Sequence, residues 1–188
     1  VTGCKSKHPG KKGQKKYLSK YIDKAIRTKC FPDLLALGMF PNSKEVTETF
    51  AMFDATEHLG PGYEWNNPKV TCVVVGDGHV PRTGAMFACR TAWSVYSVDP
   101  ALRPRTYPIE RLTVHRCGIE HVHIGCQEED NPLLIVLCHS HAKLKNCLEH
   151  IHGPQIAVIS MDCCVNQQIP NQNPDVIYRD ESVWSPAN

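Results

Sequence analysis

A glycine-containing segment that directly follows an apolar run is the first place where residue types and spacing suggest chemistry. The segment reads Gly76-Asp77-Gly78 and follows Val70–Val75. Glycines at the end of a buried strand permit a tight turn and let a ligand approach the backbone closely. The next apolar run ends in Asp99 and Pro100, and a carboxylate at that position can accept hydrogen bonds from ribose hydroxyls. The pair predicts a site for a nucleotide-like ligand, and the alternative is an inherited fold whose pocket is empty.

Two histidines, His139 and His141, follow another apolar run and are the candidates for proton transfer. A neutral imidazole can take a proton from a hydroxyl or an amine near pH 7. The alternative is that both side chains form hydrogen bonds within their loop and shape a pocket. His121 and His123 alternate in the same way, as neighbours on one face of a strand do. The chain has ten cysteines and ten histidines, but no Cys-x-x-Cys pair has a partner pair at zinc-ribbon spacing, so we predict no metal site.

The elements that must position these residues begin near residue 69, where continuous apolar runs alternate with helical or loop segments. This pattern is typical of a parallel sheet covered on both faces, and it predicts an α/β, Rossmann-like fold. The expected strands are Val70–Val75, Trp93–Val98, Leu112–His115, Leu133–Cys138 and Gln155–Met161, with residues 121–124 competing for the third place and a crossover helix over residues 83–91. The carboxyl ends of parallel strands face one crevice, so we expect the glycine segment, Asp99, His115, His139, His141 and Cys163-Cys164 to approach one another.

A helical extension is expected before the sheet. Apolar residues recur at helical spacing from Tyr17 to Ile26. A second helix is expected from Ser43, because Asn42 and Glu45 have the spacing of a capping box. We therefore divide the chain into a basic arm (1–16), a helical extension (17–68) and a Rossmann-like domain (69–188). Near the end of the chain, residues 176–178 and 182–184 are expected to form one or two short strands.

The order of a glycine turn, an acid after the second strand and a polar loop after the fourth resembles the class I S-adenosylmethionine-dependent methyltransferases, over roughly residues 69–165. Cys138-His139-Ser140-His141 and Asp162-Cys163-Cys164 are similar to the His-x-Cys-Gly and Pro-Cys-Cys stretches of a branch that includes tRNA 2′-O-methyltransferases. The resemblance implies a sheet of methyltransferase type and S-adenosylmethionine as cofactor. The residues implied to bind it are Gly76, Asp77, Gly78, Asp99 and Pro100, with His139 and His141 as catalytic residues. The chain departs from the pattern at Val74 and Lys143, where acids are usual.

The charge of the chain is divided unevenly. Residues 1–30 hold ten lysines and arginines against one acid, whereas the remainder holds eleven against eighteen acids. An arm of this kind can neutralise phosphates and release counterions, which predicts RNA as a partner; a contact to a larger protein complex is the alternative. The residues expected to contact nucleic acid are Lys5, Lys7, Lys11, Lys12, Lys15 and Lys16.

Apolar stretches and cysteines set the expected environment. No apolar stretch approaches the roughly 20 residues that a membrane-spanning helix needs, so we expect no membrane span.

Cys72, Cys89 and Cys138 lie inside apolar patterns, and the adjacent Cys163-Cys164 are poorly placed to pair with each other. We therefore expect mostly buried, reduced thiols and an intracellular reducing compartment such as the cytoplasm, the nucleus or an organelle matrix.

Three functions are compatible with these features. The leading hypothesis is a methyltransferase-like protein that binds S-adenosylmethionine and acts on RNA. The second is a catalytically inactive subunit of the same fold with a structural or RNA-binding role in a larger complex, which Val74 and Lys143 favour. The third is a nicotinamide dinucleotide enzyme that uses the same glycine turn, with the pyrophosphate near Thr83.

Overall fold

The centre of the molecule is a five-stranded, all-parallel sheet in the order β3-β2-β1-β5-β7. The structure is a computed structural model, and it describes residues 20–125, 131–161, 174–177 and 179–184. The strands are β1 (Thr71–Val75), β2 (Ser94–Val98), β3 (Leu112–His115), β5 (Pro132–Cys138) and β7 (Gln155–Met161). The expected α/β class is confirmed, and the sheet is consistent with a Rossmann-like fold. The five predicted strand positions agree with the structure to within one residue.

Strand β1 lies in the middle of the sheet because its residues can be buried on both sides. Val73 pairs in parallel register with Tyr96 of β2 and with Ile135 of β5. Successive side chains of a strand point to opposite faces. Accordingly, Val74 belongs to the larger apolar core, and Val73 and Val75 belong to a second core on the other face.

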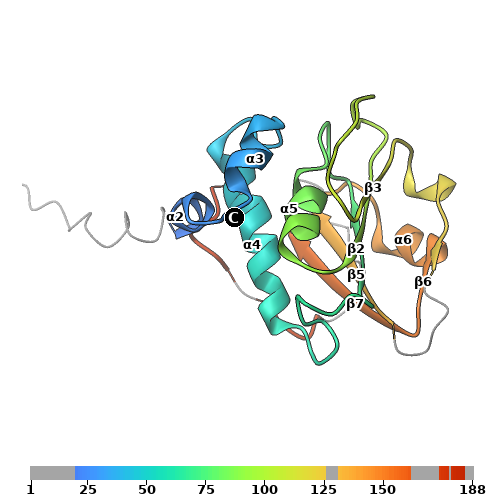
Figure 1. The fold of residues 1–188 in the computed structure, drawn as a ribbon. Coiled ribbons are helices and arrows are strands. Elements are labelled where there is room, and N and C mark those ends of the chain that lie inside the picture. Colours follow the sequence, from blue (N-terminus) through green and yellow to red (C-terminus); the bar gives the residue numbers. More distant parts are fainter. Residues whose placement is uncertain (1–19, 126–130, 162–173, 178, 185–188) are drawn as a thin grey trace, which may run out of the picture.

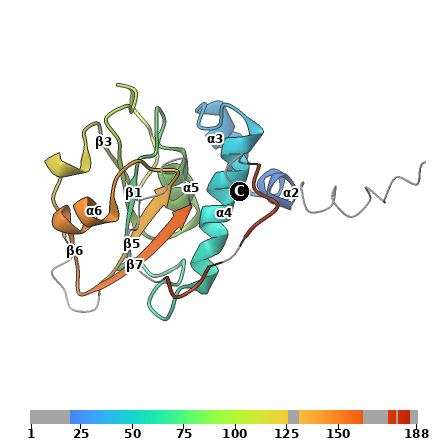
Figure 2. The same ribbon diagram turned by 180° about the vertical axis from the view of Figure 1, so that it is seen from behind.

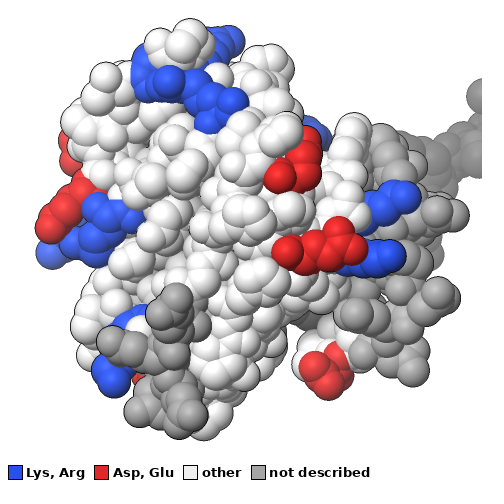
Figure 3. All heavy atoms as spheres, turned by 90° about the vertical axis from the view of Figure 1, so that its right-hand side faces the viewer, with Lys and Arg blue, Asp and Glu red and all other residues white. Residues whose placement is uncertain are grey.

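Helices cover both faces of the sheet, as Figures 1 and 2 show. One face is covered by α4 and α5, with α2 and α3 outside them, and the other by α6 and the short turn η2. The bounds are α2 (Lys20–Ile26), α3 (Phe31–Ala36), α4 (Ser43–Ala55), η1 (Thr56–His58), α5 (Arg82–Arg90), η2 (Ile119–His121) and α6 (Leu144–His150). The N-terminal helices therefore form one layer of the same core as the sheet. Figure 3 shows the side of the molecule that lies on the right in Figure 1, and the centre of this side carries few charged side chains.

Helix α4 begins where the sequence predicts. The side-chain oxygen of Asn42 accepts a hydrogen bond from the Glu45 backbone N–H at 3.0 Å, which satisfies a helix N–H that has no partner within the helix. The reciprocal half of a capping box is replaced, because the Glu45 carboxylate pairs with Arg82 instead. Phe53 of the same helix packs against Phe87 of α5 at a ring-centroid distance of 5.3 Å. This contact joins the helical extension to the crossover helix of the sheet.

Several expected features differ from the structure. Residues 121–124 are not a strand of the main sheet: His121 ends η2, and Ile124–Gly125 (β4) pairs with Ile151–His152 (β6) in a separate two-stranded sheet. The expected strands near the end of the chain are wrong for the described residues 174–177 and 179–184, which have no strand. That segment instead lies beside α2 and α4, where the Trp184 backbone N–H donates to Thr47 and Tyr21 donates to Asp180. None of the helices in the described ranges has the length and apolar character needed to cross a bilayer.

Candidate functional site

The glycine turn and Asp99 lie together at the carboxyl edge of the sheet. Gly76 and Gly78 have φ values of 81° and 79°, which lie in the left-handed region that favours glycine. Asp99 follows β2, and its Oδ2 accepts a hydrogen bond from the Gly78 N–H at 2.8 Å, while Oδ1 accepts one from the Ala101 N–H at 2.7 Å. Asp99 is only partly buried and Pro100 is exposed. The arrangement brings a turn and a carboxylate with spare acceptor capacity to one point beside the central strand.

Asp77, between the two glycines, is directed into the protein. Its Oδ1 accepts from the Thr83 N–H at 3.0 Å, and its Oδ2 accepts from the Gly84 N–H and from the Ser97 hydroxyl, both at 2.9 Å. Burial raises the pKa of this carboxyl, and the positive charge of Arg82 and these hydrogen bonds oppose the rise. The carboxylate therefore fixes the turn to the start of α5. Because the Asp77 carboxylate is buried and hydrogen-bonded within the protein, a ligand at the turn could contact only the backbone of Asp77.

The loop after β5 approaches the glycine turn very closely. A Cβ added to Gly76 would lie 2.3 Å from Ser140 Oγ and 3.0 Å from Ser140 Cα. At Gly78 the nearest atom to an added Cβ would be Arg82 Nη1, at 3.2 Å. The glycine at position 76 is thus required by the chain's own packing, and Ser140 fills the space directly above it.

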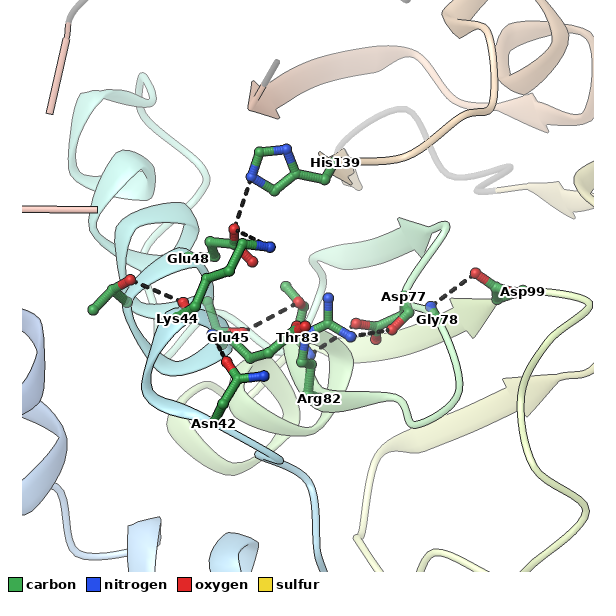
Figure 4. A network of polar contacts seen from close by, with 12 residues as sticks. Asn42, Lys44, Glu45, Glu48, Asp77, Gly78, Arg82, Thr83, Asp99 and His139 are labelled. Carbon is green, nitrogen blue, oxygen red and sulfur yellow. Dashed lines mark hydrogen bonds and ion pairs between the residues drawn. The ribbon is translucent and has the colours of Figure 1, made fainter. Parts of the chain in front are cut away.

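A network of charged side chains runs from the start of α4 across the edge of the sheet, as Figure 4 shows. Glu48 of α4 is 1% exposed, and its Oε1 lies 3.0 Å from His139 Nε2 and 3.0 Å from Lys44 Nζ. A turn earlier, Glu45 pairs with Arg82, which also donates from Nη1 to the Asp77 carbonyl oxygen at 2.8 Å. The network connects α4 with the loop after β5 and with the start of α5.

Glu48 is held as a carboxylate at the centre of this network. Burial favours the neutral acid, but the hydrogen bonds from His139 and Lys44, together with the positive charge of Lys44, outweigh burial and hold the pKa of Glu48 below its ordinary value. Its second oxygen, Oε2, is buried and has no hydrogen-bond partner within the described ranges. A buried carboxylate oxygen without a partner is costly, and it is a position where a bound donor or cation can be accommodated.

His139 is held in a backbone conformation that is uncommon for its type. Its φ is 50°, and its N–H donates to the Met161 carbonyl oxygen at 3.3 Å. Left-handed conformations of residues other than glycine cost free energy and cluster at functional sites. His139 is the first residue after β5, and its imidazole contacts Glu48.

The other predicted residues are distributed differently. His141 is solvent-exposed on the loop, and the ring of His115 stacks on Tyr96 at 6.0 Å. The alternation expected for the two histidine pairs is wrong, since His121 lies in η2 and His139 has left the strand conformation. Cys163-Cys164 and the lysines of the arm lie outside the described residues. The described ranges contain no group of three or more histidine, cysteine or acidic side chains suited to a metal ion.

Sequence reasoning missed Glu48 and its partners Lys44, Glu45 and Arg82. A signal for Glu48 was present, because it is the only acid in the run Val46–Phe53, where each of the other residues is uncharged. In the structure all of that run is buried. An acid on a buried helix face requires a compensating partner, and that requirement identifies the network.

No protein-family model, curated protein or solved structure matches the chain. Its fold and the geometry of the site are therefore the basis on which a function can be proposed.

Proposed function

We propose that this chain is a methyltransferase-like protein that binds S-adenosylmethionine at the carboxyl edge of its parallel sheet and acts on RNA. The observation that carries the proposal is the hydrogen bond from the Gly78 N–H to Asp99, at 2.8 Å. It places an acid beside the glycine turn, next to the point where the strand order reverses between β1 and β5. Ligands of open α/β sheets bind outside the carboxyl ends of the strands at such a point.

The charges of the edge fit this cofactor. S-adenosylmethionine has a ribose, and its sulfonium and ammonium groups are positive. In and beside the network, four acidic residues outnumber the two cations Lys44 and Arg82; the four are Glu45, Glu48, Asp77 and Asp99. The unpartnered Oε2 of Glu48 suits a cationic group, and Asp99 suits the ribose hydroxyls. When bound, the cofactor would supply an electrophilic methyl group.

In this proposal His139 is the residue that handles the proton of the substrate. Because Nε2 faces the Glu48 carboxylate at 3.0 Å, the proton of a neutral ring is favoured at Nε2, and Nδ1 is left as the acceptor. A substrate hydroxyl or amine could then pass its proton to Nδ1. Glu48 orients the ring and stabilises the imidazolium that results.

We propose RNA as the substrate because of the basic arm, whose lysines directly precede α2 in the sequence. The positive charge continues on the described residues, where Arg27 and Lys29 are exposed. Clustered cations bind phosphates without sequence preference. The binding is therefore expected to weaken steeply with salt.

One observation favours the second candidate, a catalytically inactive subunit of this fold. Ser140 occupies the space above Gly76, so that this glycine is accounted for without a ligand. The two candidates differ in cofactor binding and in methyl transfer, and the second has either a structural or an RNA-binding role in a larger complex.

The test is calorimetric titration of the full chain with S-adenosylmethionine, with Asp99→Ala and the exposed Glu57→Gln as matched variants. We expect measurable heat, a roughly 10- to 100-fold weaker affinity in Asp99→Ala from the loss of a charged hydrogen-bond acceptor, and no change in Glu57→Gln. Melting of each ligand-free variant is measured first, because Asp99 also holds the Gly78 N–H. No heat at millimolar cofactor, with an unchanged melting temperature, would remove the cofactor proposal.

RNA is tested separately, by incubation with methyl-labelled cofactor and by filter binding over a salt series. Label in the RNA that is lost in His139→Ala supports methyl transfer. RNA binding without label supports the inactive subunit. Absence of binding at low salt rejects RNA as partner for both candidates.

A further inference from the structure

Two cysteine side chains from different layers of the fold line one cavity at the far end of α5, away from the glycine turn. Cys30 directly precedes α3, and Cys89 lies in the last turn of α5. The two side chains are near enough that each shifts the pKa of the other. Cys30 is half-buried and Cys89 is exposed, which corrects the expectation that Cys89 lies inside an apolar face.

Both thiols line a cavity of about 1040 Å³ that opens to solvent. The other lining residues are Lys20, Asp23, Lys24, Arg27, Thr28, Lys29 and Arg90, so cations outnumber acids. Small oxidants and thiols therefore reach the pair from solvent. No residue of the Glu48 network lines this cavity.

Arg90 is fixed beside the pair. Its guanidinium lies over the ring of Phe53 at 4.6 Å and donates to the Thr28 hydroxyl at 3.3 Å. The neighbouring Cys89 thiol, and then the positive charge of Arg90, lower the pKa of Cys30, although burial and Asp33 oppose this. The neighbouring Cys30 and burial raise the pKa of Cys89. Cys30 is therefore the thiol of the pair that ionises first, as an attacking cysteine needs, and Cys89 keeps its proton, as a resolving cysteine needs.

We propose that Cys30 and Cys89 form a reversible oxidation site, in which a hydroperoxide oxidises the pair to an intramolecular disulfide between the helical extension and α5. In the first step the Cys30 thiolate attacks one peroxide oxygen; an S–O bond forms, the O–O bond breaks, and the leaving hydroxide takes a proton to become water. In the second step the Cys89 sulfur attacks the Cys30 sulfenic sulfur, forming the S–S bond. The hydroxyl group leaves with the Cys89 proton as water. Two thiols are oxidised, and hydrogen peroxide is reduced to two waters.

The remaining described cysteines do not share this arrangement. Cys72, Cys138 and Cys147 are buried, and burial raises the pKa of each. Cys117 is half-buried and lies near η2, on the other side of the sheet, so it is a matched control. A disulfide at Cys30 and Cys89 would close a loop of roughly 60 residues and constrain the unfolded chain.

The experiment treats the full chain with hydrogen peroxide, blocks remaining thiols with N-ethylmaleimide and digests with trypsin without reductant. Cleavage after lysine and arginine gives residues 30–44 and 83–90, each with one cysteine. We expect these two peptides to be linked, the link to be lost in Cys30→Ser and Cys89→Ser and kept in Cys117→Ser, and dithiothreitol to release them. The oxidised protein is expected to melt roughly 10 °C higher than the reduced protein.

Three results would overturn the proposal. The first is recovery of both peptides separately, whether alkylated or overoxidised, after full consumption of the peroxide. The second is Cys30 linked to a different cysteine in the wild-type chain. The third is Cys30 reacting no faster than Cys117.

Discussion

Replacing Gly76 by alanine tests whether the carboxyl edge is built as described. The change should cost about 1–2 kcal/mol for a side chain at a φ of 81°. A further roughly 1–3 kcal/mol comes from overpacking, because the new Cβ would meet the Ser140 backbone as well as its hydroxyl. The total of about 2–5 kcal/mol corresponds to a melting temperature roughly 5–20 °C lower for a chain of this length.

Two further variants separate these contributions in urea and thermal unfolding. Gly78→Ala has nearly the same φ, 79°, but its nearest neighbour is the end of the flexible Arg82 side chain, so about 1–2 kcal/mol is expected. Gly60→Ala has no atom within 4 Å of the new Cβ and should change stability by less than about 0.5 kcal/mol. If Gly76→Ala is as stable as Gly60→Ala, the close approach of the β5 loop to the glycine turn is wrong.

Two more predictions concern buried carboxylates. Glu48→Gln should cost about 1.5–3 kcal/mol at pH 7, because hydrogen bonds to a charged group are lost; since the folded-state pKa of Glu48 is lowered, that stability is present above the ordinary value of 4.5 and disappears as the pH falls through the folded value. Urea unfolding from pH 7 down to pH values well below 4.5 should therefore show the wild type and the variant converging in the acidic part of the range, and parallel curves there would contradict the Glu48–His139 contact. Asp77→Asn should cost about 1–3 kcal/mol, because one carboxylate oxygen that accepts hydrogen bonds becomes an amide that donates. The exposed Asp33→Asn on α3 serves as its control, and equal stability of the two variants would show that Asp77 does not hold the start of α5.

The strands could be predicted because burial on both faces leaves a continuous apolar run in the sequence. β5, for example, is buried along its whole length from Pro132 to Cys138. The start of α4 could be predicted from Asn42, since capping is a local interaction between residues three apart. Strands and helix starts of these kinds can therefore be predicted from the local sequence, without knowing how the elements pack together.

The contacts of the site could not be predicted in the same way. Glu48 contacts His139 only because α4 packs on the face of the sheet beside β5 and β7, and no local sequence pattern predicts that packing. Asp77 shows the same limit, because an acid after a glycine suits a ligand contact and a helix cap equally well. The exposure of Cys89 could not be predicted for a similar reason: it lies in an apolar stretch of the sequence, but in the structure it lines a cavity that opens to solvent.

The central position of β1 has a consequence for the order in which the chain acquires its structure on the ribosome. β1 can pair with β2 soon after both have emerged, but its other edge must wait for β5, which is made only after β3 and the segment that follows it. Until then, a nascent sheet of three strands would present an unpaired apolar edge at Val73 and its neighbours. Parallel pairings between distant segments form slowly. That interval during synthesis is therefore the stage at which this protein would depend most on a chaperone.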